Sequence, residues 1–188
     1  MRIIEMDTKR LRLRQWRTPD WDAFAALNAD PAVMEYFPHP LERQASNAVA
    51  NRIYAQLAQR GWGLWAVEVR DVAPFIGFVG LHVPEYPIPC ACNVEIGWRL
   101  DSRYWGKGYA TEAARAALAI GFEELQLPEI VSFAARANQR SHRVMERLGM
   151  RCAGELFEHP LLPEGHPLRT HVLYRLTREQ WLARSINS

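Results

Sequence analysis

The spacing of hydrophobic residues predicts a strand followed by a helix near the middle of the chain. Residues 93–100 alternate between apolar and polar side chains, which is the period of a half-buried strand. Its apolar face consists of Val94, Ile96, Trp98 and Leu100. Glu95 and Arg99 share the opposite face. Residues 109–125 carry small and apolar side chains at helical spacing, so we expect a helix there.

The same patterns predict further strands and helices on both sides of this segment. The other expected strands span residues 8–15, 64–69, 75–83, 129–134, 151–158 and 168–176. The other expected helices span 41–59 and 139–148, with one that Thr18 caps and one that begins at Thr177. In the first strand, Arg10, Arg12 and Arg14 share a face that we expect to be solvated. This order favours an α/β (α+β) fold with a mixed, strongly twisted sheet flanked by helices.

Length and composition are typical of one globular domain spanning residues 1–188. The net charge of +2 gives no reason to expect binding to nucleic acid or to a membrane surface. No signal peptide or membrane span is recognisable, so we expect a cytoplasmic protein with reduced cysteines. Cys90 and Cys92, even with His82, match no usual zinc spacing, so no metal is expected.

The connection between the central strand and its helix has the composition of an anion site. Gly106 and Gly108 allow close backbone approach, and Arg103 and Lys107 add positive charge. Free N–H groups at a helix start favour phosphate there. A P-loop needs Ser or Thr after the lysine and is excluded. A dinucleotide fingerprint needs a third glycine where Thr111 stands, so that match is weak.

A third interpretation fits the loop better. The segment Arg103-Tyr-Trp-Gly-Lys-Gly108, with Glu95-Ile-Gly-Trp before it, resembles the pyrophosphate loop of GNAT-superfamily N-acetyltransferases, in particular the RimJ/RimL-like branch. Asn138-Gln-Arg-Ser141, followed by Val144-Met-Glu-Arg-Leu-Gly-Met150, is similar to a second family element. With the opening at Thr8, the resemblance covers residues 8–176.

This resemblance implies a GNAT fold in which acetyl-CoA, the co-substrate, enters between two splayed central strands. The implied cofactor-binding residues are Ile96, Trp98, Leu100, Arg103, Tyr104, Trp105, Gly106, Lys107, Gly108, Tyr109, Ala110, Asn138 and Ser141. A backbone N–H near residues 96–98 would face the thioester carbonyl. Asn138 would contact the pantetheine arm, although it is equally placed to cap the following helix.

Acetyl transfer to an amine needs a base, and Glu95 on the polar face of the central strand is the first candidate. The alternative for Glu95 is a structural ion pair, either with a neighbouring strand or with Arg99, which shares the face but is four residues along and too distant within one strand. His82 is the second candidate base, although a solvent-facing histidine is the simpler interpretation, and water is the third. The tyrosine that many family members use as the acid is replaced by Met145, so Ser141 is the implied proton donor.

The expected function is acetyl transfer to a primary amine, by direct attack in a ternary complex. The acceptor is a protein N-terminus or a small molecule, and the chain is a monomer or a homodimer. Candidate acceptor contacts are Glu85, Tyr86, His159, Glu164 and His166. The alternative function is a non-catalytic module that senses acyl-CoA, for which the missing tyrosine leaves room.

Overall fold

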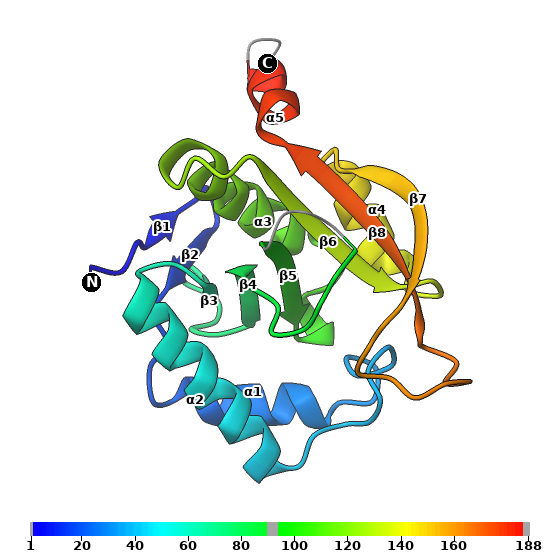
Figure 1. The fold of residues 1–188 in the computed structure, drawn as a ribbon. Coiled ribbons are helices and arrows are strands. Elements are labelled where there is room, and N and C mark those ends of the chain that lie inside the picture. Colours follow the sequence, from blue (N-terminus) through cyan, green and yellow to red (C-terminus); the bar gives the residue numbers. More distant parts are fainter. Residues whose placement is uncertain (1, 90–93, 186–188) are drawn as a thin grey trace.

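The computed structural model describes residues 2–89 and 94–185, in which eight strands form one sheet (Figure 1). The strands are β1 Met6–Asp7, β2 Leu11–Arg14, β3 Leu64–Val69, β4 Gly77–His82, β5 Glu95–Leu100, β6 Glu129–Ala135, β7 Arg151–Glu158 and β8 Thr170–Thr177. Their order across the sheet is β1-β2-β3-β4-β5-β6-β8-β7. The expected mixed α/β fold is confirmed.

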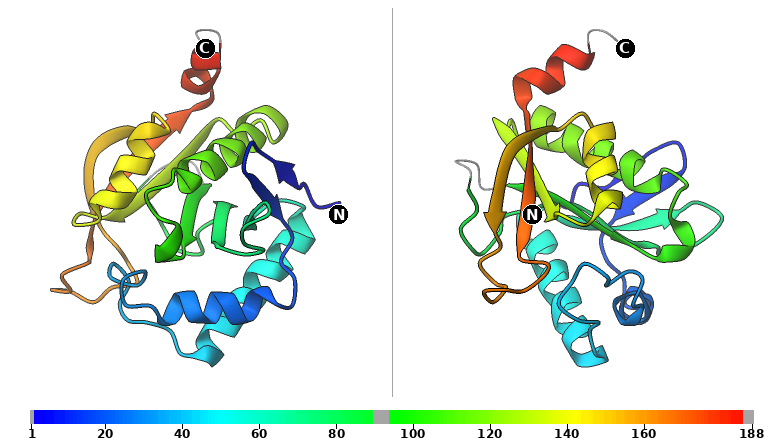
Figure 2. Two further views of the ribbon diagram at one scale, coloured as in Figure 1. Left: turned by 180° about the vertical axis from the view of Figure 1, so that it is seen from behind. Right: turned by 90° about the vertical axis from the view of Figure 1, so that its right-hand side faces the viewer.

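Helices cover both faces of this sheet. They are α1 Asp20–Ala29, α2 Arg43–Arg60, α3 Tyr109–Ala119, α4 Gln139–Arg147 and α5 Arg178–Ser185. A 3-10 turn, Ser102–Tyr104, precedes α3, and a π-helical turn, Ile120–Glu124, follows it. Figure 2 shows α3 and α4 together on one side of the sheet and α1 and α2 away from them.

Most predicted elements are present, with boundaries moved by a few residues. The short strand β1 was not predicted, and the strand expected at residues 8–15 is confined to Leu11–Arg14. The helix expected at 109–125 is α3 followed by the π-helical turn. Thr177 caps α5 as expected, because its hydroxyl oxygen accepts a hydrogen bond from the N–H of Gln180. Asn93, Cys90 and Cys92 lie outside the described residues.

The two central strands separate after a single paired position. β5 runs parallel to β6, and the register between them contains only Glu95 opposite Val131. By contrast, β4 and β5 pair antiparallel along six positions, from Gly77 with Leu100 to His82 with Glu95. The divergence frees the backbone edge of β5 from β6 as the strands approach Leu100. The predicted splay is therefore confirmed.

The predicted solvated face of the first strand is wrong for Arg14. Its side chain is 1% exposed and forms ion pairs with Asp20 at 2.8 Å and Glu68 at 2.9 Å. Asp20 also accepts a hydrogen bond from the N–H of Arg17, and Thr18 provides no side-chain cap for α1. The start of α1 covers this end of β2, so a charge cluster is buried where solvent was expected.

Replacing Arg14 with methionine should destabilise the fold strongly, because Asp20 would remain buried without its cation. The expected loss is about 3–5 kcal/mol in the free energy of unfolding, measured by urea denaturation. Arg12→Met is the control, since the Arg12 side chain is 42% exposed and pairs with Glu5 at 3.0 Å, and it should cost less than about 1 kcal/mol. Equal losses in the two variants would contradict a structural role for the buried cluster.

Candidate active site

The glycine-containing loop presents an open backbone at the start of α3. Gly106 and Gly108 have φ of +74° and +79°, a region that residues with a side chain rarely adopt. Gly108 is also the N-cap of α3, and no side chain caps this helix. A Cβ added at Gly106 would meet nothing within 4 Å, so backbone conformation and not crowding requires glycine there. Uncapped N–H groups of the first turn are thus available to an anion.

The predicted basic residues of this loop lie at its surface. Arg103 is 78% exposed and forms an ion pair with Asp101 at 2.6 Å. The Lys107 ammonium lies 5.2 Å from the centre of the Tyr104 ring. Neither cation is buried, so both can turn toward a phosphate at small cost. Tyr104, Trp105, Tyr109 and Ala110 are partly buried and pack against the hydrophobic core, which anchors the loop.

Trp105 connects this loop to α4. Its indole N–H donates to the carbonyl oxygen of Leu100 at 2.8 Å, and the Arg140 guanidinium lies 4.5 Å from its ring centre. This contact was not predicted, because it joins segments separated by 35 residues that only the fold brings together. It links the loop before α3 to the first turn of α4.

The start of α4 carries the other two predicted site residues. The side-chain oxygen of Asn138 accepts a hydrogen bond from the N–H of Ser141 at 3.1 Å, so its capping role is confirmed. Ser141 is partly buried in the first turn. Met145, one turn later, is 1% exposed and faces the core, where it offers no proton to a thiolate.

The apolar residues of β5 differ in their accessibility. Ile96 is completely buried and Leu100 is 5% exposed, whereas Trp98 is only partly buried. The side chains of Ile96 and Leu100 therefore belong to the core. The structure leaves Trp98 and the strand backbone as the groups that a ligand between β5 and β6 would meet.

Buried Glu95 and partly buried His82 form a pair across the antiparallel strands β4 and β5. They are register partners, and His82 Nε2 lies 3.2 Å from Glu95 Oε2. Burial raises the pKa of Glu95 well above its usual value. Burial, with smaller contributions from Arg52 and Arg60, lowers the pKa of His82 to about 4. Both shifts favour the uncharged forms, a protonated Glu95 and an unprotonated His82, so that the pair holds one proton between them.

Two interpretations of these residues are corrected by the contacts. His82 does not simply face solvent, since it is bonded to Glu95. Of the two ion-pair partners considered for Glu95, Arg99 is excluded, since it donates from Nη1 to the Asn28 side-chain oxygen at 2.7 Å. Four residues along a strand span about 13 Å, too far for direct contact. The other, a partner on a neighbouring strand, is present as His82 of β4.

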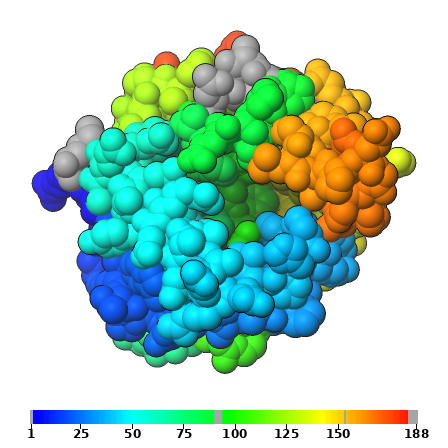
Figure 3. All heavy atoms as spheres, turned by 60° about the horizontal axis from the view of Figure 1, so that its bottom comes forward, coloured from blue at the N-terminus to red at the C-terminus, as the bar shows by residue number. Residues whose placement is uncertain are grey.

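A hollow opens on the side of the sheet away from α3 (Figure 3). Its floor has the dark green of β5, and its walls are α1 and α2, the segment 83–89, and the connection 159–169. Across it, the hydroxyl of Tyr86 and Nε2 of His159 lie 3.1 Å apart. Burial raises the pKa of Tyr86. Two of the five predicted acceptor contacts are therefore brought together.

The other three predicted acceptor contacts lie apart from that pair. Glu85 accepts a hydrogen bond from Gln56 of α2 at 3.3 Å. Glu164 is exposed, and His166 accepts a hydrogen bond from the N–H of Leu168 within its own loop. These three side chains belong to the rim or to the loop surface, and not to the pair formed by Tyr86 and His159.

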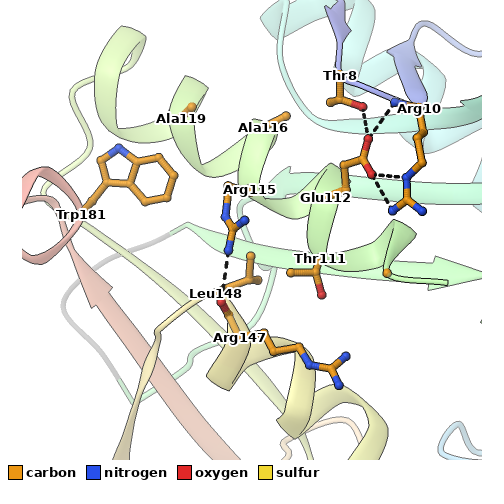
Figure 4. A pocket seen from close by; sticks show the side chains of 11 residues that line it. Thr8, Arg10, Thr111, Glu112, Arg115, Ala116, Ala119, Arg147, Leu148 and Trp181 are labelled. Atoms are coloured by element: carbon orange, nitrogen blue, oxygen red, sulfur yellow. Dashed lines mark hydrogen bonds and ion pairs between the residues drawn. The ribbon is translucent and has the colours of Figure 1, made fainter. Parts of the chain in front are cut away.

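A separate groove of about 960 Å³ runs along the outer face of α3 (Figure 4). It begins at Gly108 and reaches Trp181 of α5. Glu112 points to Thr8 and Arg10, with which it forms hydrogen bonds of 2.7 Å each. Neither Glu95 nor His82 lines this groove.

Within residues 2–89 and 94–185, no group of three or more His, Cys, Asp or Glu side chains is arranged to hold a metal ion. In the same residues, no helix combines the length and the apolar character that a membrane span requires.

Comparison with known proteins identifies the family. The sequence model described as "Acetyltransferase (GNAT) domain" matches residues 10–151, well over half of the chain. The chain belongs to the GNAT acetyltransferases. It is 32% identical over 179 residues to the uncharacterized N-acetyltransferase YnaD of Bacillus subtilis, covering 95% of this chain and 99% of YnaD. The chain is therefore an N-acetyltransferase, as its sequence predicted.

Solved structures agree with this assignment. A GNAT-family acetyltransferase from Bacillus anthracis superposes with a TM-score of 0.78 at 27% identity, covering 94% of this chain and 99% of the other. RimL, a ribosomal L7/L12 alpha-N-protein acetyltransferase in complex with coenzyme A, superposes with a TM-score of 0.73 at 15% identity, covering the same shares. The RimL likeness is one of fold and is consistent with the predicted RimJ/RimL-like branch.

Replacing Gly108 with valine should lower the affinity of this acetyltransferase for acetyl-CoA by tenfold or more, about 1.4 kcal/mol, measured by calorimetric titration. The side chain would strain a φ of +79° and displace the N–H groups of the loop. Gly165→Val is the matched control, because Gly165 has the same φ and open space around it. Equal affinities in the two variants would refute the loop as the anion site.

Proposed function

We propose that residues 1–188 form one acetyl-CoA-dependent domain that transfers the acetyl group to a primary amine by direct attack in a ternary complex. One observation carries this proposal. β5 separates from β6 beside the uncapped start of α3, and Glu95 of the same strand pairs with His82. Besides burial, the charges of Arg52 and Arg60, on α2, lower the pKa of His82. The strand thus offers one edge to a thioester and a polar face to an amine.

The cofactor would be held mainly by backbone groups. The N–H groups of residues 106–110 would bind the pyrophosphate. Arg103 would exchange its ion pair with Asp101, and Lys107 its contact with the Tyr104 ring, for contacts with the phosphates. The pantetheine would lie along the free edge of β5, beside Trp98 and the capped turn at Asn138. A backbone N–H near residues 96–98 would then stabilise the oxyanion of the tetrahedral intermediate.

Glu95 would remove a proton from the incoming ammonium. A carboxylate with a raised pKa is a stronger base than an ordinary one, and His82 is positioned to share the proton. The neutral amine nitrogen would then form a bond to the thioester carbon, and the carbon–sulfur bond would break. The second nitrogen proton would reach the thiolate, with Ser141 as its proposed donor.

A second candidate function is a non-catalytic acyl-CoA sensor. The observation that favours it is the buried Met145 at the position of the family's tyrosine acid. A coenzyme A thiolate leaves without full protonation, however, so the missing acid would slow turnover without abolishing it. The pair of Glu95 and His82 favours the enzyme, since a sensor has no need of a base.

The acceptor is proposed to be a protein N-terminus or a small-molecule amine. The fold shared with RimL, named as an alpha-N-protein acetyltransferase, supports the first class. Calorimetric titration with acetyl-CoA, followed by a coenzyme A release assay against amines and N-terminal peptides, tests the whole proposal. Binding with release for one class supports it. Binding without release for every amine favours the sensor, and absence of binding refutes both functions.

Glu95→Gln should lower kcat by about 10²–10⁴-fold, because the amide accepts no proton. In the wild type, kcat/KM should rise with pH as the carboxyl loses its proton, at a pH above the usual glutamate range because its pKa is raised. This acidic limb should disappear in the variant.

Glu85→Gln is the matched control, since Glu85 lies at the rim and contacts Gln56. It should keep the wild-type pH profile. An unchanged profile in Glu95→Gln would transfer the role of base to His82 or to water.

A further inference from the structure

Arg99 lies on the same face of β5 as Glu95, four residues back along the strand, and Gly97, two residues back. A Cβ added at Gly97 would lie 3.8 Å from Glu95 Oε1 and 3.9 Å from His82 Cε1, which confirms the shared face. Arg99 contacts Asn28 of α1, so this face is the one that forms the floor of the hollow in Figure 3. The chain thus places a cation in line with its proposed base.

Among the described residues, the groups that the Arg99 side chain contacts are uncharged. Its guanidinium carbon lies 4.0 Å from the ring centre of Phe37 and 5.6 Å from that of Phe78, and Nη1 bonds to Asn28. Its Nε is buried without a hydrogen-bond partner in the described residues. Burial lowers the pKa of Arg99 to about 10, so the side chain is still positively charged at neutral pH.

Arg14 and Arg175, which also lie on strands, differ from Arg99 in having carboxylate partners. Arg14 pairs with Asp20 and Glu68, and Arg175 pairs with Glu129 and Glu155. No carboxylate within residues 2–89 and 94–185 forms such a pair with Arg99. A largely buried cation without a counter-ion is costly, and an anion that reached it would gain strong, charge-assisted hydrogen bonds.

The guanidinium is also held in place before any ligand arrives. Asn28 is completely buried, and its amide nitrogen donates to Ser46 at 2.9 Å, which directs its oxygen toward Arg99. The Phe37 ring supports the guanidinium plane from another side. Since these contacts fix the side chain, little further entropy is lost when a planar carboxylate binds.

We propose that Arg99 binds a carboxylate of the acceptor and so selects amines that carry an acidic group. This inference rests on the proposed acetyl transfer and names the acceptor class for that same site. The Cα atoms of Glu95 and Arg99 are about 13 Å apart along the strand, so several bonds separate the amine from the carboxylate. An extended amino acid and an acidic side chain near a protein N-terminus both offer this chemistry.

Matched acceptor pairs test the proposal directly. The small-molecule arm compares 6-aminohexanoate with its primary amide. The peptide arm compares N-terminal peptides that carry Glu or Gln at the second position. At saturating acetyl-CoA, the acid should be preferred over its amide by about ten- to a hundredfold in kcat/KM, mainly through KM, as hydrogen bonds to a charged group imply. The arm that shows the preference identifies the source of the carboxylate.

Arg99→Gln should bring the ratio of acid to amide close to one, and Arg99→Lys, which keeps the charge but loses the planar fork, should give an intermediate ratio. Arg12→Gln, a change at an arginine paired with Glu5, should keep the wild-type ratio. The lysine variant and the wild-type comparison remain decisive if the glutamine variant fails to fold.

Three results would overturn the proposal. They are equal use of acid and amide by the wild type, turnover of no acidic amine in either arm, and an equal loss of both activities in Arg99→Gln. The last result would show that Arg99 only fastens α1 to the sheet. Failure to bind acetyl-CoA is a separate outcome, and it would count against the proposed function itself.

Discussion

The site depends on one break in backbone pairing. β5 and β6 are parallel neighbours in the middle of an eight-stranded sheet, yet only Glu95 and Val131 are in register. Six pairs with β4 hold the other edge of β5, so the strand keeps its position although one edge is free. A free strand edge inside a sheet leaves backbone N–H and C=O groups that need a partner. A pantetheine arm, which carries amides of its own, is such a partner.

Alternation along the same strand divides the chemistry between its two faces. Ile96 and Leu100 anchor β5 in the core, while Glu95, Gly97 and Arg99 face the hollow beside α1 and α2. The uncapped start of α3 and the Asn138 cap of α4 lie by the separated ends of β5 and β6, joined by the stacking of Arg140 on Trp105. The proposed phosphate site is thereby kept apart from the proposed sites of proton transfer and acceptor selection.

The sequence predicted features that depend on neighbours along the chain. The strand, glycine loop and helix of residues 93–125 and the caps at Asn138 and Thr177 are of this kind. Features that depend on tertiary packing were missed or assigned wrongly. Arg14 is buried because α1 brings Asp20 to it. His82 contacts Glu95 because of the register between β4 and β5, which cannot be read from the sequence of the connection at residues 83–94. The neutral surroundings of Arg99 come from Asn28 and Phe37, which only the fold brings near.

A crystal structure of the protein with coenzyme A tests the central claim most directly. The account predicts the pantetheine between β5 and β6, with the pyrophosphate on the backbone of Gly106 and Gly108 and the sulfur on the side of Glu95. Coenzyme A bound only along the outer groove of α3, with β5 and β6 left empty, would contradict it.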